Sequence, residues 1–218
     1  MDAADRLAAV QAGIRRACAS AGRADAPLLV AVSKTFAADA IEPLIAAGQR
    51  HFGENRVQEA GAKWPALQTH TPGIVLHLVG QLQSNKAAEA IALFSVIHSV
   101  DRPSLVAALG KAQAATGKRP ACYLQANIGD EAQKGGCALA DLPALLDQAR
   151  HAGLDIAGLM CVPPADIEPG PYFALLAEHA KRLGLAGLSM GMSSDYETAA
   201  LLGSTVVRVG SALFGSRG

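Results

Sequence analysis

Lys34 follows directly on an apolar run, and its amine is the first group in this sequence suited to covalent chemistry. The run Leu28-Leu29-Val30-Ala31-Val32-Ser33 has the length and composition of a buried strand, which would deliver the amine to the rim of a sheet. Partial burial favours the neutral form of an amine, and a neutral amine attacks aldehydes. A lone lysine is more commonly a solvated surface residue, so the assignment depends on its partners.

Two glycine-serine segments near the end of the chain have the composition of an anion-binding site. They are Leu188-Ser189-Met190-Gly191-Met192-Ser193 and Val206-Val207-Arg208-Val209-Gly210-Ser211. Glycine lets backbone N–H groups approach an anion, serine adds hydroxyl donors, and a helix that begins there favours negative charge. Ordinary capping is the alternative, with Ser193 or Ser194 as N-cap and Glu197 closing a capping box. Because a second glycine-serine segment is present, an anion site is the preferred interpretation over capping alone.

Arg208 interrupts an apolar run, which is unusual for a residue that stays charged. An ion pair or a snorkelling side chain would explain it equally well. In the functional interpretation, the guanidinium lies beside the pyridine nitrogen of a bound cofactor. That nitrogen would then stay unprotonated, and the cofactor ring would be a weaker electron sink. Asn55 follows the second predicted strand, where it could reach the same ligand or form an Asx turn or helix cap.

An amine, an anion site and an arginine are together what pyridoxal 5'-phosphate (PLP) requires when it is held as a Schiff base. A Schiff-base aldolase that binds a sugar phosphate would use the same amine and anion site, so this second chemistry stays open.

These groups need a scaffold, and the chain alternates short apolar runs with helical patterns. The predicted strands are 28–33, 51–53, 75–79, 94–99, 122–128, 156–161, 187–190 and 206–209. The helical patterns between them are 39–48, 55–67, 85–93, 102–116, 139–153, 172–183 and 195–202, and another covers 3–20. No Gly-x-Gly-x-x-Gly follows the first strand, which disfavours a dinucleotide-binding sheet. We therefore predict an α/β fold, a single (β/α)8 TIM barrel over residues 1–218 with an extra N-terminal helix.

A closed barrel would bring together residues that lie far apart in the sequence. The last strand closes against the first, so Lys34 would neighbour Arg208, and the loops after strands 7 and 8 recur as a phosphate site in this fold. Side chains alternate along a strand, so an inward Lys34 shares its face with Val30 and Val32, and Arg208 shares its face with Val206.

Composition excludes several function classes. Formal charge is zero without charged blocks, so nucleic-acid binding is not expected. No segment has the pattern of a signal peptide or a membrane span, and the four cysteines lack metal-ligand or disulfide spacing. We expect a cytoplasmic protein without a metal. His51, His77 and His98 fall in predicted strands without ligand spacing and are interpreted as core histidines.

Several ordered motifs resemble the pyridoxal phosphate homeostasis protein family (YggS/PROSC-like proteins). They are Ala31-Val32-Ser33-Lys34-Thr35, His51-Phe52-Gly53-Glu54-Asn55, His77-Leu78-Val79-Gly80, Leu82-Gln83-Ser84-Asn85-Lys86, Asn127-Ile128, Gly158-Leu159-Met160 and the two glycine-serine segments. The resemblance implies a barrel like the N-terminal one of bacterial alanine racemase, with PLP as a Schiff base on Lys34. It implies phosphate contacts at Ser193, Gly210 and Ser211, with Ser189 and Gly191 as further candidates, and Arg208 at the pyridine nitrogen.

The expected function is a monomeric, non-catalytic carrier in vitamin B6 homeostasis that supplies PLP to apo-enzymes. The alternative is a PLP-dependent amino-acid racemase or decarboxylase of fold type III. Racemisation needs two bases on opposite faces of the substrate. In the racemase that the barrel resembles, the second base is a tyrosine from an additional domain, whereas Tyr123, Tyr172 and Tyr196 lie within the predicted barrel. Lys86 and Lys134 could attract a second phosphate or a recipient protein, although solvated loop lysines are the preferred interpretation.

Overall fold

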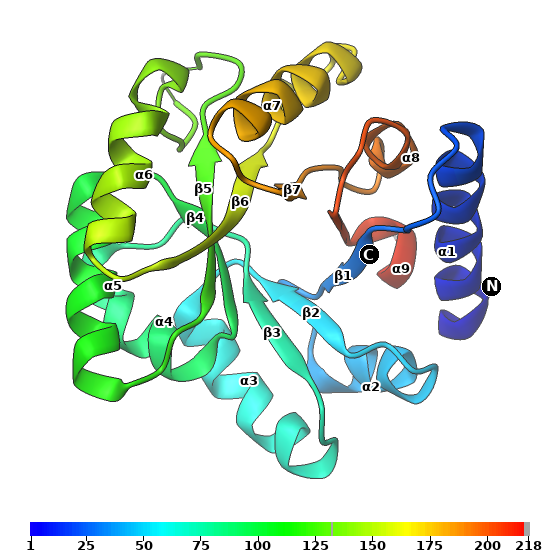
Figure 1. Ribbon diagram of the computed structural model, residues 1–218. Helices are drawn as coiled ribbons and strands as arrows, with labels where there is room; N and C mark the ends of the chain where they lie inside the picture. Colours follow the sequence, from blue (N-terminus) through cyan, green and yellow to red (C-terminus); the bar gives the residue numbers. More distant parts are fainter. Residues whose placement is uncertain (132, 216–218) are drawn as a thin grey trace.

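Eight parallel strands close into a barrel in the order β1 to β8 (Figure 1). The computed structural model describes residues 1–131 and 133–215. The strands are β1 (Leu28–Val32), β2 (His51–Glu54), β3 (Val75–Leu78), β4 (Val96–Val100), β5 (Ala121–Ala126), β6 (Asp155–Cys161), β7 (Gly187–Ser189) and β8 (Val206–Val209). The predicted TIM barrel is confirmed, with all eight strands near their expected positions.

Helices surround the strands, as the alternating pattern predicted. They are α1 (Ala3–Ser20), α2 (Ala38–Ala46), α3 (Val57–His70), α4 (Ala87–Leu93), α5 (Pro103–Thr116), α6 (Leu142–His151), α7 (Gly170–Arg182), α8 (Tyr196–Leu201) and α9 (Ser211–Phe214). Two short 3-10 turns, η1 (Ser84–Lys86) and η2 (Leu139–Asp141), precede α4 and α6. The expected strand from residue 94 begins only at Val96, because the Phe94 amide still donates to Ala90 of α4.

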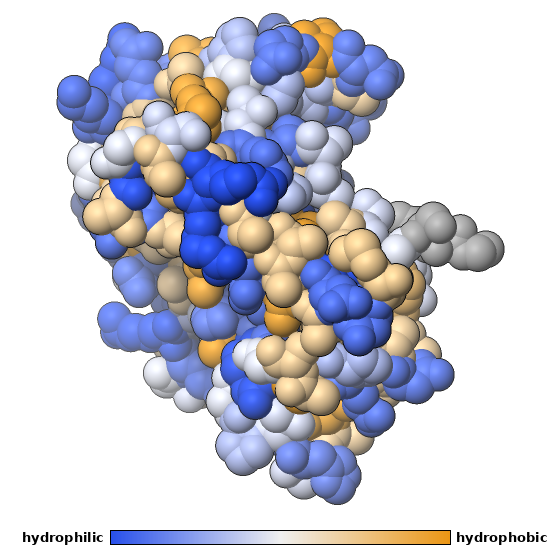
Figure 2. Space-filling view, turned by 90° about the vertical axis from the view of Figure 1, so that its right-hand side faces the viewer, coloured by the Kyte–Doolittle hydropathy of each residue, from blue (hydrophilic) through white to orange (hydrophobic). Residues whose placement is uncertain are grey.

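The extra N-terminal helix is confirmed and packs on the outside against α8 and α9 (Figure 1). Leu7, Val10, Ile14 and Cys18 are buried on one side of α1, as expected for apolar residues at helical spacing. On the molecular face that carries α1, strongly hydrophobic residues appear only in small, separate areas (Figure 2). Within the described chain, no helix is both long and apolar enough to cross a membrane.

Apolar side chains form two separate cores because strand residues alternate between the two sides of the barrel wall. The larger core lies between strands and helices and includes Phe52 and Trp64. The smaller core contains Val30, Tyr123, Met160 and Val206. Other strand positions on the same side of the wall as the smaller core bury polar side chains, among them His77, His98, Ser189 and Arg208.

Candidate functional site

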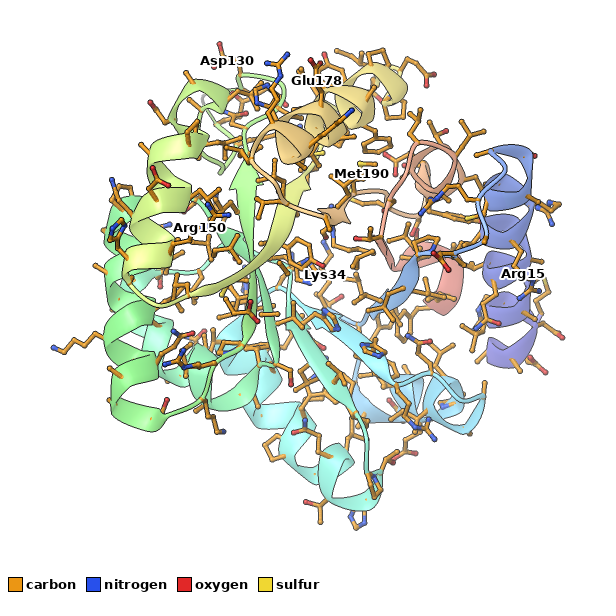
Figure 3. The ribbon with its side chains drawn as sticks, viewed as in Figure 1. Arg15, Lys34, Asp130, Arg150, Glu178 and Met190 are labelled. Carbon is orange, nitrogen blue, oxygen red and sulfur yellow. The ribbon has the colours of Figure 1, made fainter. Side chains whose placement is uncertain are left out.

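A cavity of about 590 Å³ lies at the carboxyl ends of the strands, where a parallel barrel assembles its binding sites. Six of the eight predicted ligand contacts line it: Lys34, Asn55, Ser193, Arg208, Gly210 and Ser211. The other lining residues are Val32, Phe36, Val79, Val162, Met192, Ser194 and Gly215. Figure 3 shows Lys34 near the middle of the ring of strands.

The turn that carries Lys34 is fixed by contacts from α3. Lys63 Nζ donates to the carbonyl oxygens of Ser33 (3.0 Å) and Phe36 (2.9 Å). The Thr35 amide donates to Glu59 Oε1 at 2.5 Å. Thr35 has φ 68°, a conformation that costs a β-branched residue of order 1–3 kcal/mol. The surrounding contacts therefore impose a strained turn that aims the half-buried Lys34 into the cavity.

A buried ion pair behind the barrel wall supports the same turn. Lys63 Nζ lies 2.7 Å from Glu54 Oε1, and their side chains are only 9% and 0% exposed. The same Glu54 oxygen accepts from Ser33 Oγ at 2.6 Å and from Trp64 Nε1 at 3.0 Å. Our sequence interpretation did not include this pair. Glu54 alternates with Asn55, so its side chain faces α3 while Asn55 lines the cavity.

Arg208 is buried and makes two hydrogen bonds that hold its guanidinium at the cavity wall. Nη1 donates to Ser189 Oγ at 2.6 Å and Nη2 donates to the Cys161 carbonyl at 2.8 Å. No carboxylate within the described chain forms an ion pair with it, and the residue is only 5% exposed with both Nη atoms bonded inside the protein, so neither an ion pair nor a snorkelling side chain explains its position. Burial lowers the pKa of Arg208 from its ordinary value, which is so far above neutrality that the side chain stays cationic.

The loops after β7 and β8 are joined through one hydroxyl. Ser193 Oγ accepts from the amides of Gly210 (3.0 Å) and Ala212 (3.4 Å), which brings Ser193 and Ser211 to the same side of the cavity. The capping alternative is wrong, because Asp195 occupies the N-cap of α8 and makes no side-chain cap bond. Instead Asp195 Oδ1 accepts from the Met192 amide at 2.5 Å and closes the loop.

Ser189 and Gly191 lie outside the cavity lining, unlike the other six residues. Ser189 is fully buried beneath Arg208 and contacts it directly. Gly191 has φ 96°, and a Cβ there would lie 2.5 Å from the Ala199 methyl, so glycine is needed where this loop packs on α8. Both residues therefore support the site from behind.

Asn55 lies on the cavity wall and does not cap α3. The N-cap of α3 is Arg56, without a side-chain cap bond. Gly80, after β3, packs against the Asn55 backbone, and a Cβ at Gly80 would lie 2.3 Å from the Asn55 carbonyl oxygen. Close packing of these two loop segments fixes the position of Asn55.

The two loop lysines are held in ion pairs. Lys86 Nζ lies 2.7 Å from Glu89, and Lys134 Nζ lies 2.6 Å from Glu131 and donates to the Pro163 carbonyl. Lys134 borders a second cavity of about 210 Å³, which shares Val79 and Val162 with the first. Among the residues that the structure describes, no cluster of His, Cys, Asp or Glu has the geometry of a metal site.

The residues present fit a small, flat ligand that carries an aldehyde and a phosphate. The amine enters from β1, the buried guanidinium from β8, and hydroxyl groups from the loops after β7 and β8. Such a ligand fits within the cavity volume, since binding sites for small molecules begin at about 300 Å³. Fold and site together define a class of proteins, parallel barrels with a lysine after the first strand and a cavity lined by glycine and serine at the closing seam.

Comparisons with known proteins agree with this class. The family model described as alanine racemase, N-terminal domain, matches residues 6–218. The pyridoxal phosphate homeostasis protein of Deinococcus radiodurans is 43% identical over 94% of this chain and 98% of its own length. Its counterpart in Pseudomonas aeruginosa is 41% identical over 98% of this chain and 95% of its own length.

Among solved structures, PipY of Synechococcus elongatus PCC7942 with PLP bound is 40% identical, with a TM-score of 0.86 over 98% of this chain and all of its own. This chain therefore belongs to the pyridoxal phosphate homeostasis protein family, whose barrel is that of the alanine racemase N-terminal domain.

Proposed function

We propose that this protein binds PLP covalently through Lys34 and holds it as a reserve for vitamin B6 homeostasis. The observation that carries the proposal is the composition of the cavity, in which a primary amine, a buried arginine and three serines converge from three segments. The relative PipY, solved with PLP bound, supports the choice of ligand.

Each of the site residues contacts or supports a different part of PLP. The Lys34 amine attacks the aldehyde carbon, a C=N bond forms, and one water molecule leaves. Ser193, Gly210 and Ser211 face the phosphate, and Arg208 faces the ring nitrogen. Asn55 contacts the ring or its substituents, while Ser189 and Gly191 act from behind, through Arg208 and the loop. The whole barrel serves as one PLP-binding domain.

A carrier role without catalysis fits the chemistry of the cavity wall. Among the described residues that line it, Lys34 and Arg208 are the only ionisable ones. Racemisation needs a second base, and decarboxylation and transamination benefit from a protonated ring nitrogen that accepts electrons. A racemase or decarboxylase of fold type III remains the second candidate, because its barrel would present the same lysine and arginine.

The proposed recipients are apo-enzymes that need PLP, served by a monomeric carrier in the cytoplasm. A reducing compartment suits the four cysteines, which are all buried and free in the part of the chain that the structure describes.

Borohydride reduction followed by peptide mass spectrometry tests the proposal. The expected result is one pyridoxyl group on Lys34, lost in Lys34→Arg and kept in the control Lys86→Arg, whose lysine is paired with Glu89. Attachment at a different lysine, or no attachment, would refute it. Incubating holo-protein with amino acids in D2O separates the two candidates, because the racemase exchanges the α-hydrogen at enzymatic rates and the carrier does not.

A further inference from the structure

A continuous chain of side-chain contacts crosses the barrel interior from the cavity floor to the amino end of β2. It begins at Ser189, whose Oγ lies 2.8 Å from His98 Nδ1. His98 Nε2 lies 2.9 Å from His77 Nδ1, and His77 Nε2 lies 3.0 Å from His51 Nδ1. The contacts pass from β7 to β4, β3 and β2, so four strands contribute one residue each.

The donors and acceptors available at each contact allow only one direction for the hydrogen bonds in this series. Arginine only donates, so Ser189 Oγ accepts from Arg208 Nη1. The buried hydroxyl has one other partner, His98 Nδ1, and must donate to it, since an unpaired buried donor costs about 1–3 kcal/mol. His98 therefore carries its hydrogen on Nε2 and donates to His77 Nδ1. By the same reasoning His77 donates from Nε2 to His51 Nδ1.

The surroundings keep the histidines of this hydrogen-bond chain neutral, as the assigned hydrogen positions require. His77 and His98 are 2% and 0% exposed, and burial lowers the pKa of His77 to about 3. Among the residues that the structure describes, the charged or titratable groups that contact this hydrogen-bond chain are Arg208 at its inner end and Tyr123, whose ring stacks on His98 at 4.7 Å. Within the described chain, no carboxylate forms an ion pair with any of the three histidines.

We infer, resting on the proposed function, that Ser189, His98, His77 and His51 form one polarised hydrogen-bond chain that positions Arg208 against the ring nitrogen of PLP. Each group fixes the donor and acceptor sides of the next, so the Ser189 lone pair is always turned toward Arg208 Nη1. His98 and His77 are positioning residues, because they act on the ligand through Ser189 and Arg208.

Histidine tautomers in the ligand-free protein test the chain without any PLP. Two-bond 1H–15N spectra should show His98 and His77 with hydrogen on Nε2. Ser189→Ala removes the group that sets the direction, so His77, which contacts neither Ser189 nor Arg208, should become a tautomer mixture. Ser99→Ala is the matched control, because Ser99 is equally buried and its Oγ has no partner among the described residues. Hydrogen on Nδ1 of wild-type His98, or an unchanged His77 in Ser189→Ala, would overturn the inference.

Ligand binding supplies a second readout that a merely structural role would not reproduce. His77→Leu should weaken PLP binding about tenfold, the equivalent of about 1.4 kcal/mol, with attachment still on Lys34. The affinity of the same His77→Leu variant for 1-deaza-PLP, which lacks the ring nitrogen, should stay within about twofold of the wild-type affinity for that analogue. Equal losses for both ligands would contradict the positioning role. If wild-type protein binds neither ligand, the proposed function fails, while the tautomer result still decides whether the polarised chain exists.

Discussion

Val30 of β1 pairs directly with Arg208 of β8, at the seam where the first and last strands close the barrel. Both side chains are buried, and Val30 belongs to the smaller core. Because alternate residues of β1 share a face, Lys34 is on the same side of the wall as Val30 and Val32. One strand pairing therefore brings a primary amine and a guanidinium to the same cavity, although they come from opposite ends of the sequence.

The first prediction concerns the Ser193 hydroxyl, which joins the loops after β7 and β8 and which we propose faces the phosphate of PLP. Ser193→Ala should lower the affinity for PLP by roughly tenfold or more, because a hydrogen bond to a charged group is worth about 1.5–3 kcal/mol. The affinity for pyridoxal, which has no phosphate, should not change. Absorbance titrations with both aldehydes measure the difference, with Ser20→Ala on the exposed end of α1 as control. Equal losses for the two aldehydes would place Ser193 away from the phosphate.

Much of this architecture could be predicted from sequence because periodicity reports burial. The runs before Lys34 and around Arg208 are apolar on both faces, as in a parallel sheet covered by helices. The closed barrel then follows from eight strands, and with it the closeness of the two residues. The inward-facing alternation of Val30 and Val32 also extends correctly to Lys34.

The remaining features depend on contacts that no local pattern encodes. Asp195 takes the cap position expected for a serine, because its carboxylate is drawn to the Met192 amide in a tight loop. His98 and Ser189 meet across the barrel, from β4 to β7, and their spacing in sequence is unrelated to that distance. Buried histidines without ligand spacing look like packing residues until the barrel closes.

The second prediction concerns the buried ion pair behind Lys34. Lys63→Met should reduce the free energy of unfolding by about 3–5 kcal/mol, because it leaves the Glu54 carboxylate buried without its counter-charge. The paired change Lys63→Met with Glu54→Gln should be milder than the sum of the single changes. Urea unfolding measures both, and Arg182→Met, which removes an exposed pair with Glu178, should cost at most about 1 kcal/mol. A loss at Lys63 as small as at Arg182 would show that the pair is solvated.

The third prediction compares two glycines. Gly80→Ala should destabilise the fold by about 1–3 kcal/mol or more, because the new methyl group overlaps the Asn55 backbone and cannot rotate away. Gly61→Ala, in α3 with nothing within 4 Å of the added carbon, should stabilise by about 0.5–1 kcal/mol. Thermal unfolding ranks the two variants. The close packing of Asn55 against Gly80 would be contradicted if both changes were neutral.

The fourth prediction is a pH dependence of stability that originates in the barrel interior. Burial lowers the pKa of His77 from 6.5 to about 3. At a pH between these two values, His77 is protonated in the unfolded chain and neutral in the folded protein. The free energy of unfolding therefore falls as pH falls through this range, by about 1.4 kcal/mol per pH unit for this residue. Burial also lowers the pKa of His98 well below its ordinary value, so its effect has the same sign.

Urea unfolding between pH 7 and pH 5 measures this dependence. His77→Gln keeps a neutral polar side chain but removes the titration, so it should make the decline shallower by about 2 kcal/mol over the interval from pH 6.5 to 5. His151→Gln, at an exposed position on α6, is the control for replacing a histidine outside the barrel interior. A slope in His77→Gln equal to that of the wild type would mean that the buried imidazole takes up its proton in the folded state, which a chain with its acceptor side turned toward His98 does not allow.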